Sequence, residues 1–166
     1  MTNQSSGPPD GAETPTGVSA DALDALVCFD LYAASRLVTA AYRPVLADLG
    51  LTYPQYLVLM VLWTRGECSI KELATTLRLD HATLSPLLRR MESAGLIARE
   101  RSVADERSVL VRTTDRGAAL HTVRDDVYCR INEAIGLPPE QVAQLQGLLR
   151  TVTANLVTDG SDVTLG

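Results

Sequence analysis

Residues 69–114 read SIKELATTLRLDHATLSPLLRRMESAGLIARERSVADERSVLVRTT, and this stretch decides the fold. Ser69 and Glu72 have the spacing of a capping box, which predicts a short helix that ends near Leu77. A second helix follows after a tight turn, and a two-stranded hairpin comes directly after that helix. This order is typical of a DNA-binding unit, because a helix fits the major groove and a narrow basic hairpin can reach the minor groove.

The second helix has Asp80 as its expected N-cap and runs to Ala94. Pro86 leaves two starts open. If the helix begins at Ala82, Pro86 removes one backbone hydrogen bond inside it. If the helix begins later, Ser85 is the N-cap and Pro86 occupies the first helical position.

The first turns of this helix carry short polar side chains that suit base edges, namely His81, Thr83 and Ser85. Two arginines that suit phosphates follow them, Arg89 and Arg90. The alternative is that all five side chains lie on the solvated face of an ordinary helix, since the surface is the default position of a charged residue.

The predicted hairpin pairs residues 97–101 with residues 109–113. Arg107 lies at its tip, and Asp105 two residues earlier can hold the guanidinium in a fixed direction. The net charge of the chain is −5, but six of its 20 acidic residues lie in segments 1–24 and 156–166, which contain no Lys or Arg. The remaining residues combine 15 basic with 14 acidic side chains, a net charge of +1. The total therefore hides a local basic surface of the kind that phosphate contact requires.

The length of 166 residues is sufficient for one domain with its own core. Residues 1–20 are rich in Ser, Thr, Gly and Pro, and we expect them and residues 157–166 to form disordered tails around a domain of residues 21–156. Apolar residues at helical spacing predict further helices over 21–48, from Tyr53 to Trp63, from Thr114 to Gly136 and from Pro138 onward.

No apolar run approaches the length that spans a membrane, and the first residues have neither the basic start nor the apolar segment of a secretory signal. We therefore expect a cytoplasmic protein without a membrane partner. The three cysteines form no C-x-x-C pair, and both histidines lie far from them in sequence. This pattern predicts free thiols, with neither a disulfide framework nor a metal or other cofactor.

Cys28 lies in a helical stretch, with Tyr32 one turn away on the same face. Tyr42 lies on nearly the same stripe but 14 residues further on, about 21 Å along a straight helix at roughly 1.5 Å per residue. One chain cannot bring Tyr42 to this thiol, whereas a second chain packed antiparallel can. These residues leave Cys28 as either an inert packing residue or a sensor.

Several segments of the chain resemble the MarR family of winged-helix repressors, and they are Leu73-Ala74, Asp80, residues 83–92, Gly95-Leu96-Ile97, Arg101 and residues 105–109. Residues 50–59 and the segment around Cys28 resemble the branch of this family that senses organic hydroperoxides, the OhrR-like repressors. The resemblance is close over residues 22–120 and rests on helical pattern alone over residues 121–156.

The resemblance implies a mainly α-helical protein with a small β-hairpin wing, in which a winged helix-turn-helix is flanked by N- and C-terminal dimerisation helices. Residues 69–114 would be the DNA-binding lobe, and residues 21–48 and 115–156 would hold a homodimer together. The implied partner is double-stranded DNA with a palindromic operator, and the protein would not be an enzyme. Family roles in DNA binding would fall on Thr83, Ser85 and Arg89 in the recognition helix and on Arg107, oriented by Asp105, in the wing.

The resemblance also implies roles for the thiols and tyrosines. Cys28 would be the sensor of an organic hydroperoxide, with Tyr42 and Tyr53 reaching it from the partner chain and Tyr32 from its own. Tyrosine hydroxyls can donate hydrogen bonds that favour a thiolate, and only a thiolate attacks a peroxide. Some members of this branch have a second, resolving cysteine, so we expect oxidised Cys28 to form an intersubunit disulfide with Cys129.

Other interpretations of the cysteines remain open. Oxidised Cys28 can instead condense with a small thiol while Cys129 only packs, and Cys68 has no role in the branch and is expected to be a bystander. A MarR-type repressor released by a small phenolic ligand would need the cysteines only for packing. A thiol peroxidase or cysteine hydrolase would need a base near the thiol, and both histidines are remote. A purely structural dimerisation module would leave Arg107 and the hairpin unexplained.

Overall fold

The computed structural model describes Leu23, residues 25–102 and residues 108–158, with Thr158 described by its backbone alone. The chain divides into two compact units, residues 1–36 and residues 37–166. The expected tail at residues 1–20 and the hairpin tip lie outside the described residues. The other expected tail begins at residue 157, whereas the last helix runs to Thr158; residues 159–166 lie outside the described residues.

The structure is mainly α-helical with one small sheet, as the sequence predicts. In chain order its elements are α2 (Val27–Ala47), α3 (Tyr53–Arg65), β1 (Cys68–Ser69), α4 (Ile70–Leu77), α5 (His81–Ser93), β2 (Ile97–Arg101), β3 (Val109–Thr113), α6 (Asp115–Ala119), a 3₁₀ turn η1 (Leu120–Val123), α7 (Arg124–Ile135) and α8 (Pro139–Thr158).

Hydrogen bonds of nearby side chains cap the N-termini of the two helices of the DNA-binding lobe. At α4 the Glu72 backbone N–H donates to Ser69 Oγ at 3.2 Å, and the Ser69 N–H donates to Glu72 Oε2 at 2.7 Å, which completes the predicted capping box. At α5 the Thr83 N–H donates to Asp80 Oδ1 at 2.6 Å. Asp80 is therefore the N-cap, the earlier of the two predicted starts is correct, and Pro86 lies inside the helix.

The predicted hairpin forms with Ile97 opposite Thr113 and Arg101 opposite Val109. The sheet also contains a third, unpredicted strand, since β1 pairs antiparallel with β3 through Cys68 and Val111. A two-residue strand has too little sequence pattern to be predicted, and its pairing depends on β3, more than 40 residues further along the chain.

The predicted long helix from Thr114 to Gly136 is wrong, because the structure breaks it into α6, η1 and α7. Thr122 and Val123 at the break are β-branched and poor helix formers. Gly117 lies directly against the Leu96 carbonyl, so α6 is held by the base of the hairpin. Such a tertiary contact overrides helical periodicity.

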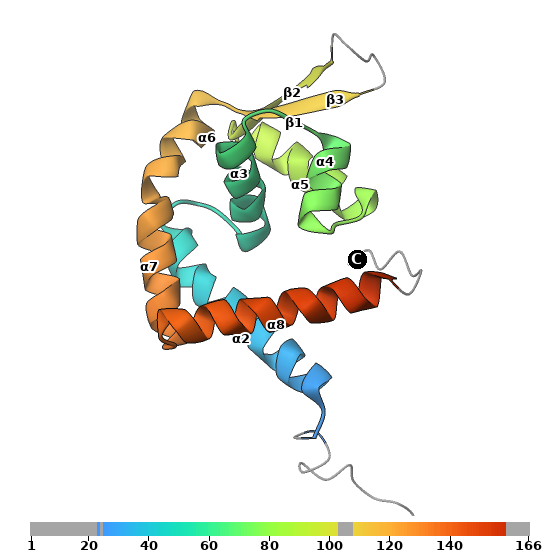
Figure 1. Cartoon of the computed structure of the whole chain (residues 1–166). Helices are drawn as coiled ribbons and strands as arrows, with labels where there is room; N and C mark the ends of the chain where they lie inside the picture. Colours follow the sequence, from blue (N-terminus) through green and yellow to red (C-terminus); the bar gives the residue numbers. More distant parts are fainter. Residues whose placement is uncertain (1–22, 24, 103–107, 159–166) are drawn as a thin grey trace, which may run out of the picture. The chain divides into compact units, whose positions relative to one another are not determined.

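Helices α3, α4 and α5 lie against the small sheet (Figure 1), and their leucine side chains are buried there. The most completely buried residues of this core are Leu46, Val58, Leu59, Leu73, Leu84, Leu88, Met91 and Val111. The core therefore packs the helices and strands of the DNA-binding lobe against one another.

The flanking helices α2 and α8 differ from this core because many of their apolar side chains are exposed in the single chain. Val27 and Leu37 on α2 are each 71% exposed, and Leu148 on α8 is 61% exposed. In the described part of the chain, no helix is long and apolar enough to cross a membrane.

Candidate DNA interface and thiol site

Helix α5 buries one face, whose apolar residues are Leu84, Leu87, Leu88 and Met91, so its opposite face points to solvent. Helical geometry puts Arg89 near the middle of the opposite face. Thr83 and Arg90 lie on one flank of that face, and His81 and Ser85 lie on the other. The five predicted contact residues of this helix therefore share one solvent-facing surface.

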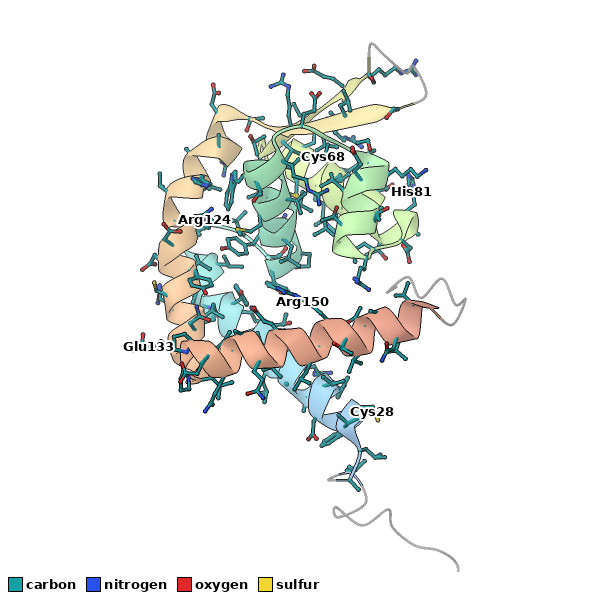
Figure 2. All side chains as sticks on the ribbon, viewed as in Figure 1. Cys28, Cys68, His81, Arg124, Glu133 and Arg150 are labelled. Carbon is teal, nitrogen blue, oxygen red and sulfur yellow. The ribbon has the colours of Figure 1, made fainter. Side chains whose placement is uncertain are left out.

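His81 and Ser85 interact with each other on this surface, since Ser85 Oγ lies 3.1 Å from His81 Nδ1. Both groups can exchange this weak exposed bond for a bond to a base edge. Figure 2 shows His81 at the start of α5, on the outer side of the lobe.

Residues 89–116, the most arginine-rich part of the predicted basic surface, contain seven arginines, but several of them are already paired within the chain. Arg99 Nε donates to Glu92 at 3.0 Å, and Arg112 donates to Glu100 at 2.6 Å. Arg116 instead holds the Ala94 carbonyl at 2.8 Å. Arg89, Arg90 and Arg101 have no partner among the described residues and remain available to phosphates. The predicted wing pair of Asp105 and Arg107 lies outside the described residues.

The three cysteines are free thiols in different environments. Cys28 on α2 and Cys129 on α7 are exposed, whereas Cys68 on β1 is only 3% exposed. Burial raises the pKa of the Cys68 thiol, and the nearby Glu72 carboxylate raises it further. Cys68 is therefore poorly suited to form a reactive thiolate, which agrees with a bystander role (Figure 2).

Tyr32 lies one turn from Cys28, and its hydroxyl is held in place. Arg36 Nη1 donates to the Tyr32 hydroxyl oxygen at 2.8 Å, and the guanidinium carbon lies 5.4 Å from the centre of the Tyr32 ring. Because the oxygen accepts this bond, the hydroxyl proton remains free to be donated to another group. Arg36 was not among the predicted site residues, although its spacing of four residues from Tyr32 indicates that the two side chains can meet on one helix face.

Tyr42 and Tyr53 are brought together from α2 and α3, with ring centres 4.5 Å apart. The ring centre of Tyr56, which was not among the predicted site residues, lies 5.9 Å from that of Tyr42. Burial raises the pKa of Tyr42 from its ordinary 10.0 to about 12, and Tyr53 and Tyr56 contribute to this rise. Burial also raises the pKa of Tyr53. Both hydroxyls are thus protonated donors at neutral pH, without a hydrogen-bond partner in the described part of the chain.

Residues 51–109 match the MarR family. Over 134 residues the chain is 42% identical to the organic hydroperoxide resistance transcriptional regulator of Bacillus subtilis, a match that covers 81% of this chain and 91% of the relative. The chain belongs to the MarR family.

Solved structures of two MarR-type proteins resemble this one. Overoxidised AbfR bound to DNA has a TM-score of 0.63 at 33% identity, covering 77% of this chain and 90% of that one. The disulfide form of AbfR, a protein of Staphylococcus epidermidis, has a TM-score of 0.56 at 31% identity and covers 76% and 89%. The repressor CouR on a 23-mer DNA duplex has a TM-score of 0.73 at 28% identity and covers 79% and 94%.

Family membership confirms the predicted winged helix-turn-helix fold and identifies the chain as a MarR-type DNA-binding transcriptional regulator. The expectation that it is not an enzyme is confirmed by the same membership. Within this fold, α5 occupies the position of a recognition helix and β2 and β3 form the wing.

The arginine pairing of this MarR protein predicts which side chains set the salt dependence of DNA binding. Replacing Arg90, which is unpaired among the described residues, by Gln should lower the slope of log Kd against log salt by about 1 per bound chain. Arg112→Gln is the matched control, because Glu100 already binds its guanidinium. Titration of labelled duplex at several salt concentrations measures both slopes. An equal fall in the two variants would show that the ion pairs do not hold Arg112 away from the phosphates.

The raised pKa of Tyr42 predicts a stability change at high pH. Because the folded protein holds this proton more tightly than the unfolded chain, folding binds protons between pH 10 and about 12. The contribution of the Tyr42 proton to the free energy of unfolding should therefore be fully present below pH 10 and should be lost as the pH rises toward 12. Urea unfolding of wild type and Tyr42→Phe across this range tests it. The free energy of unfolding should fall less steeply with pH in the variant than in wild type. If the two curves of free energy against pH ran parallel, the fall would come from groups other than Tyr42.

Proposed function

We propose that this protein is a dimeric repressor that senses organic hydroperoxides through oxidation of Cys28 and then releases its operator. The observation that carries the proposal is the placement of Cys28, an exposed thiol one turn from an oriented tyrosine hydroxyl. The similarity to the organic hydroperoxide resistance regulator of Bacillus subtilis supports the choice of effector.

The exposed apolar side chains of α2 and α8 support the dimer. Large exposed apolar patches mark interaction surfaces, and a second copy of the chain would cover both helices. Residues 21–48 and 115–156 then act as dimerisation helices around the lobe of residues 69–114. A dimer places two copies of α5 on a palindromic operator, each with Thr83, Ser85 and Arg89 toward the bases. Arg107, oriented by Asp105, would contact the DNA from the tip of each wing.

In the sensing step, the Cys28 thiolate attacks the terminal peroxide oxygen and the O–O bond breaks. The peroxide is reduced to an alkoxide that takes up a proton and leaves as an alcohol, while Cys28 becomes a sulfenic acid. Tyr32 from its own chain, and Tyr42 and Tyr53 from the partner, donate hydrogen bonds that stabilise the thiolate before attack. The raised pKa values of Tyr42 and Tyr53 suit this role, because their hydroxyls keep the protons that they donate.

In the resolving step, the Cys129 thiol of the partner condenses with the sulfenic acid, an S–S bond forms and water leaves. Cys129 supports this step because it is exposed on α7, whereas Cys68 is buried. AbfR offers a parallel, since its overoxidised form was solved on DNA and a disulfide form was solved as well. The disulfide would displace the tyrosine hydroxyls, and a small rotation of the subunits would change the spacing of the recognition helices.

The experiment is a DNA-release assay on the reduced protein. A labelled duplex selected from a randomised library by the reduced protein is titrated, and cumene hydroperoxide is then added. Release by the hydroperoxide, together with a dimer band on non-reducing electrophoresis that Cys129→Ser abolishes and Cys68→Ser retains, supports the scheme. Release without a dimer band would indicate that a small thiol, and not Cys129, condenses with oxidised Cys28. Binding that resists hydroperoxide contradicts the proposal.

A second candidate function is release by a small phenolic acid. A cavity of about 470 Å³ lies between α8 and the turn after α4, and it combines Arg78 and Arg150 with apolar residues such as Leu149 and Leu156. This volume and lining suit a small anionic aromatic ligand. In the same assay, 4-hydroxybenzoate would release the duplex and cumene hydroperoxide would not.

A further inference from the structure

Helix α3 carries a thiolate-supporting tyrosine at one end and the only tryptophan of the chain near the other. Tyr53 is its first residue and Trp63 lies ten residues later, about 15 Å along a rigid helix. A row of aromatic contacts runs along α3. The ring of Tyr42 contacts those of Tyr53 and Tyr56, and the ring centre of Tyr56 lies 6.0 Å from that of Trp63. A displacement of Tyr53 is therefore transmitted along α3 to Trp63.

Trp63 binds α3 to the segment that follows the wing. Its indole Nε1–H donates to the Gly117 carbonyl at 2.9 Å, across 54 residues of sequence. Tyr56 and His121 contact the indole edge-on from different elements, with ring centres 6.0 and 5.5 Å from it. These contacts fix the direction of the N–H group, so a movement of α3 would also move α6.

The start of α6 in turn holds the end of the recognition helix and the beginning of β2. The Thr114 N–H donates to the Leu96 carbonyl at 3.1 Å, and Thr114 Oγ1 donates to the Gly95 carbonyl at 2.6 Å. Arg116 Nη1 donates to the Ala94 carbonyl at 2.8 Å. Gly117 itself lies so close to Leu96 that a Cβ atom would come within 2.0 Å of its carbonyl oxygen. The residues that link α5 to the wing are thus all bonded to the segment that Trp63 holds.

We propose that Trp63 is a positioning residue that transmits the state of the sensor tyrosines to the recognition helix. Its hydrogen bond to Gly117 makes α3, α6 and the end of α5 move as one body. When oxidation of Cys28 removes the partner of Tyr53, α3 shifts and carries the wing base with it. The inference rests on the proposed function, since it requires that Tyr53 responds to Cys28.

The experiment measures the coupling between oxidation and DNA affinity in wild type, Trp63→Phe and Thr64→Val. Phenylalanine keeps an aromatic ring at position 63 and removes the N–H donor. Thr64→Val is the matched control, because it removes a hydrogen bond of the same helix, from Thr64 Oγ1 to the Met60 carbonyl, that does not reach α6. For each protein the Kd of the selected duplex is measured before and after cumene hydroperoxide, and Cys28 oxidation is quantified by thiol labelling.

In Trp63→Phe, the ratio of oxidised to reduced Kd should fall by about 2- to 10-fold relative to wild type, the range expected for one lost hydrogen bond. The extent of Cys28 oxidation should be unchanged, and Thr64→Val should keep the wild-type ratio. A purely structural role would weaken binding in both redox states and leave the ratio intact, which would overturn the inference. If wild type itself does not respond to the hydroperoxide, the proposed function fails instead.

Intrinsic fluorescence gives a second measurement in the unmodified chain, because Trp63 is its sole tryptophan. Oxidation should change the indole emission in wild type, since the indole lies between groups of α3, α6 and η1. Cys28→Ser should abolish the change. An emission that stays constant while the duplex is released would show that the Trp63 junction does not move, and would contradict the inference.

Discussion

Cys28→Ser is expected to bind its operator like the reduced wild-type protein and to stay bound in the presence of an organic hydroperoxide. Serine preserves size and helical context, and Cys28 lies on α2, outside the DNA-binding lobe. A hydroxyl at position 28 is neither ionised at neutral pH nor oxidised by a peroxide. In wild type, oxidation should weaken binding by about 5- to 150-fold, the usual range of coupling between two sites. In the variant the Kd should change less than about 2-fold.

Anisotropy of the labelled duplex measures both affinities, and two further variants make the result specific. Cys68→Ser should respond like wild type because its thiol is buried and its pKa is raised. Cys129→Ser separates sensing from resolution, since it retains the sulfenic acid step. A Cys28→Ser protein that still released DNA under hydroperoxide would move the sensor to another residue and leave the scheme without its central step.

Features that depend on neighbours in sequence were predictable. The capping box of Ser69 and Glu72, the Asp80 cap and the pairing of residues 97–101 with 109–113 all follow from spacing, and the structure has each of them. The predicted DNA contacts on α5 share one face for the same reason, since helical periodicity alone puts them opposite the buried leucines.

Features that depend on tertiary contacts were not predictable. The short strand β1 exists because β3 lies beside it, and the break after α6 follows from the approach of Gly117 to Leu96. Counting arginines overstated the basic surface, because Glu92 and Glu100 come close to Arg99 and Arg112 only after folding. The tyrosine pair was inferred from family resemblance, whereas its shared burial, which raises the pKa of Tyr42, is a property of the folded chain.

Gly117→Ala is expected to destabilise the fold by about 2–4 kcal/mol, although helix propensity alone would favour alanine by about 1 kcal/mol. The added Cβ would lie 2.0 Å from the Leu96 carbonyl oxygen and 3.0 Å from its carbon, and both are backbone atoms that cannot rotate away. Either the Leu96 peptide moves, which disturbs its bond from the Thr114 N–H, or α6 retreats and loses the bond from Trp63. Each lost bond contributes roughly 1 kcal/mol.

Urea unfolding at a fixed protein concentration measures the change, because the stability of a dimer depends on concentration. The melting temperature should fall by roughly 5–15 °C for a chain of this size. Gly147→Ala is the matched control, since in the single chain a Cβ added to this glycine of α8 would have no neighbouring atom within 4 Å, and helix propensity alone predicts a gain of about 0.5–1 kcal/mol. If Gly117→Ala were as stable as Gly147→Ala, α6 would be free to slide on the wing base. The bonds that connect α3 to the recognition helix would then be too compliant to transmit a movement of the sensor.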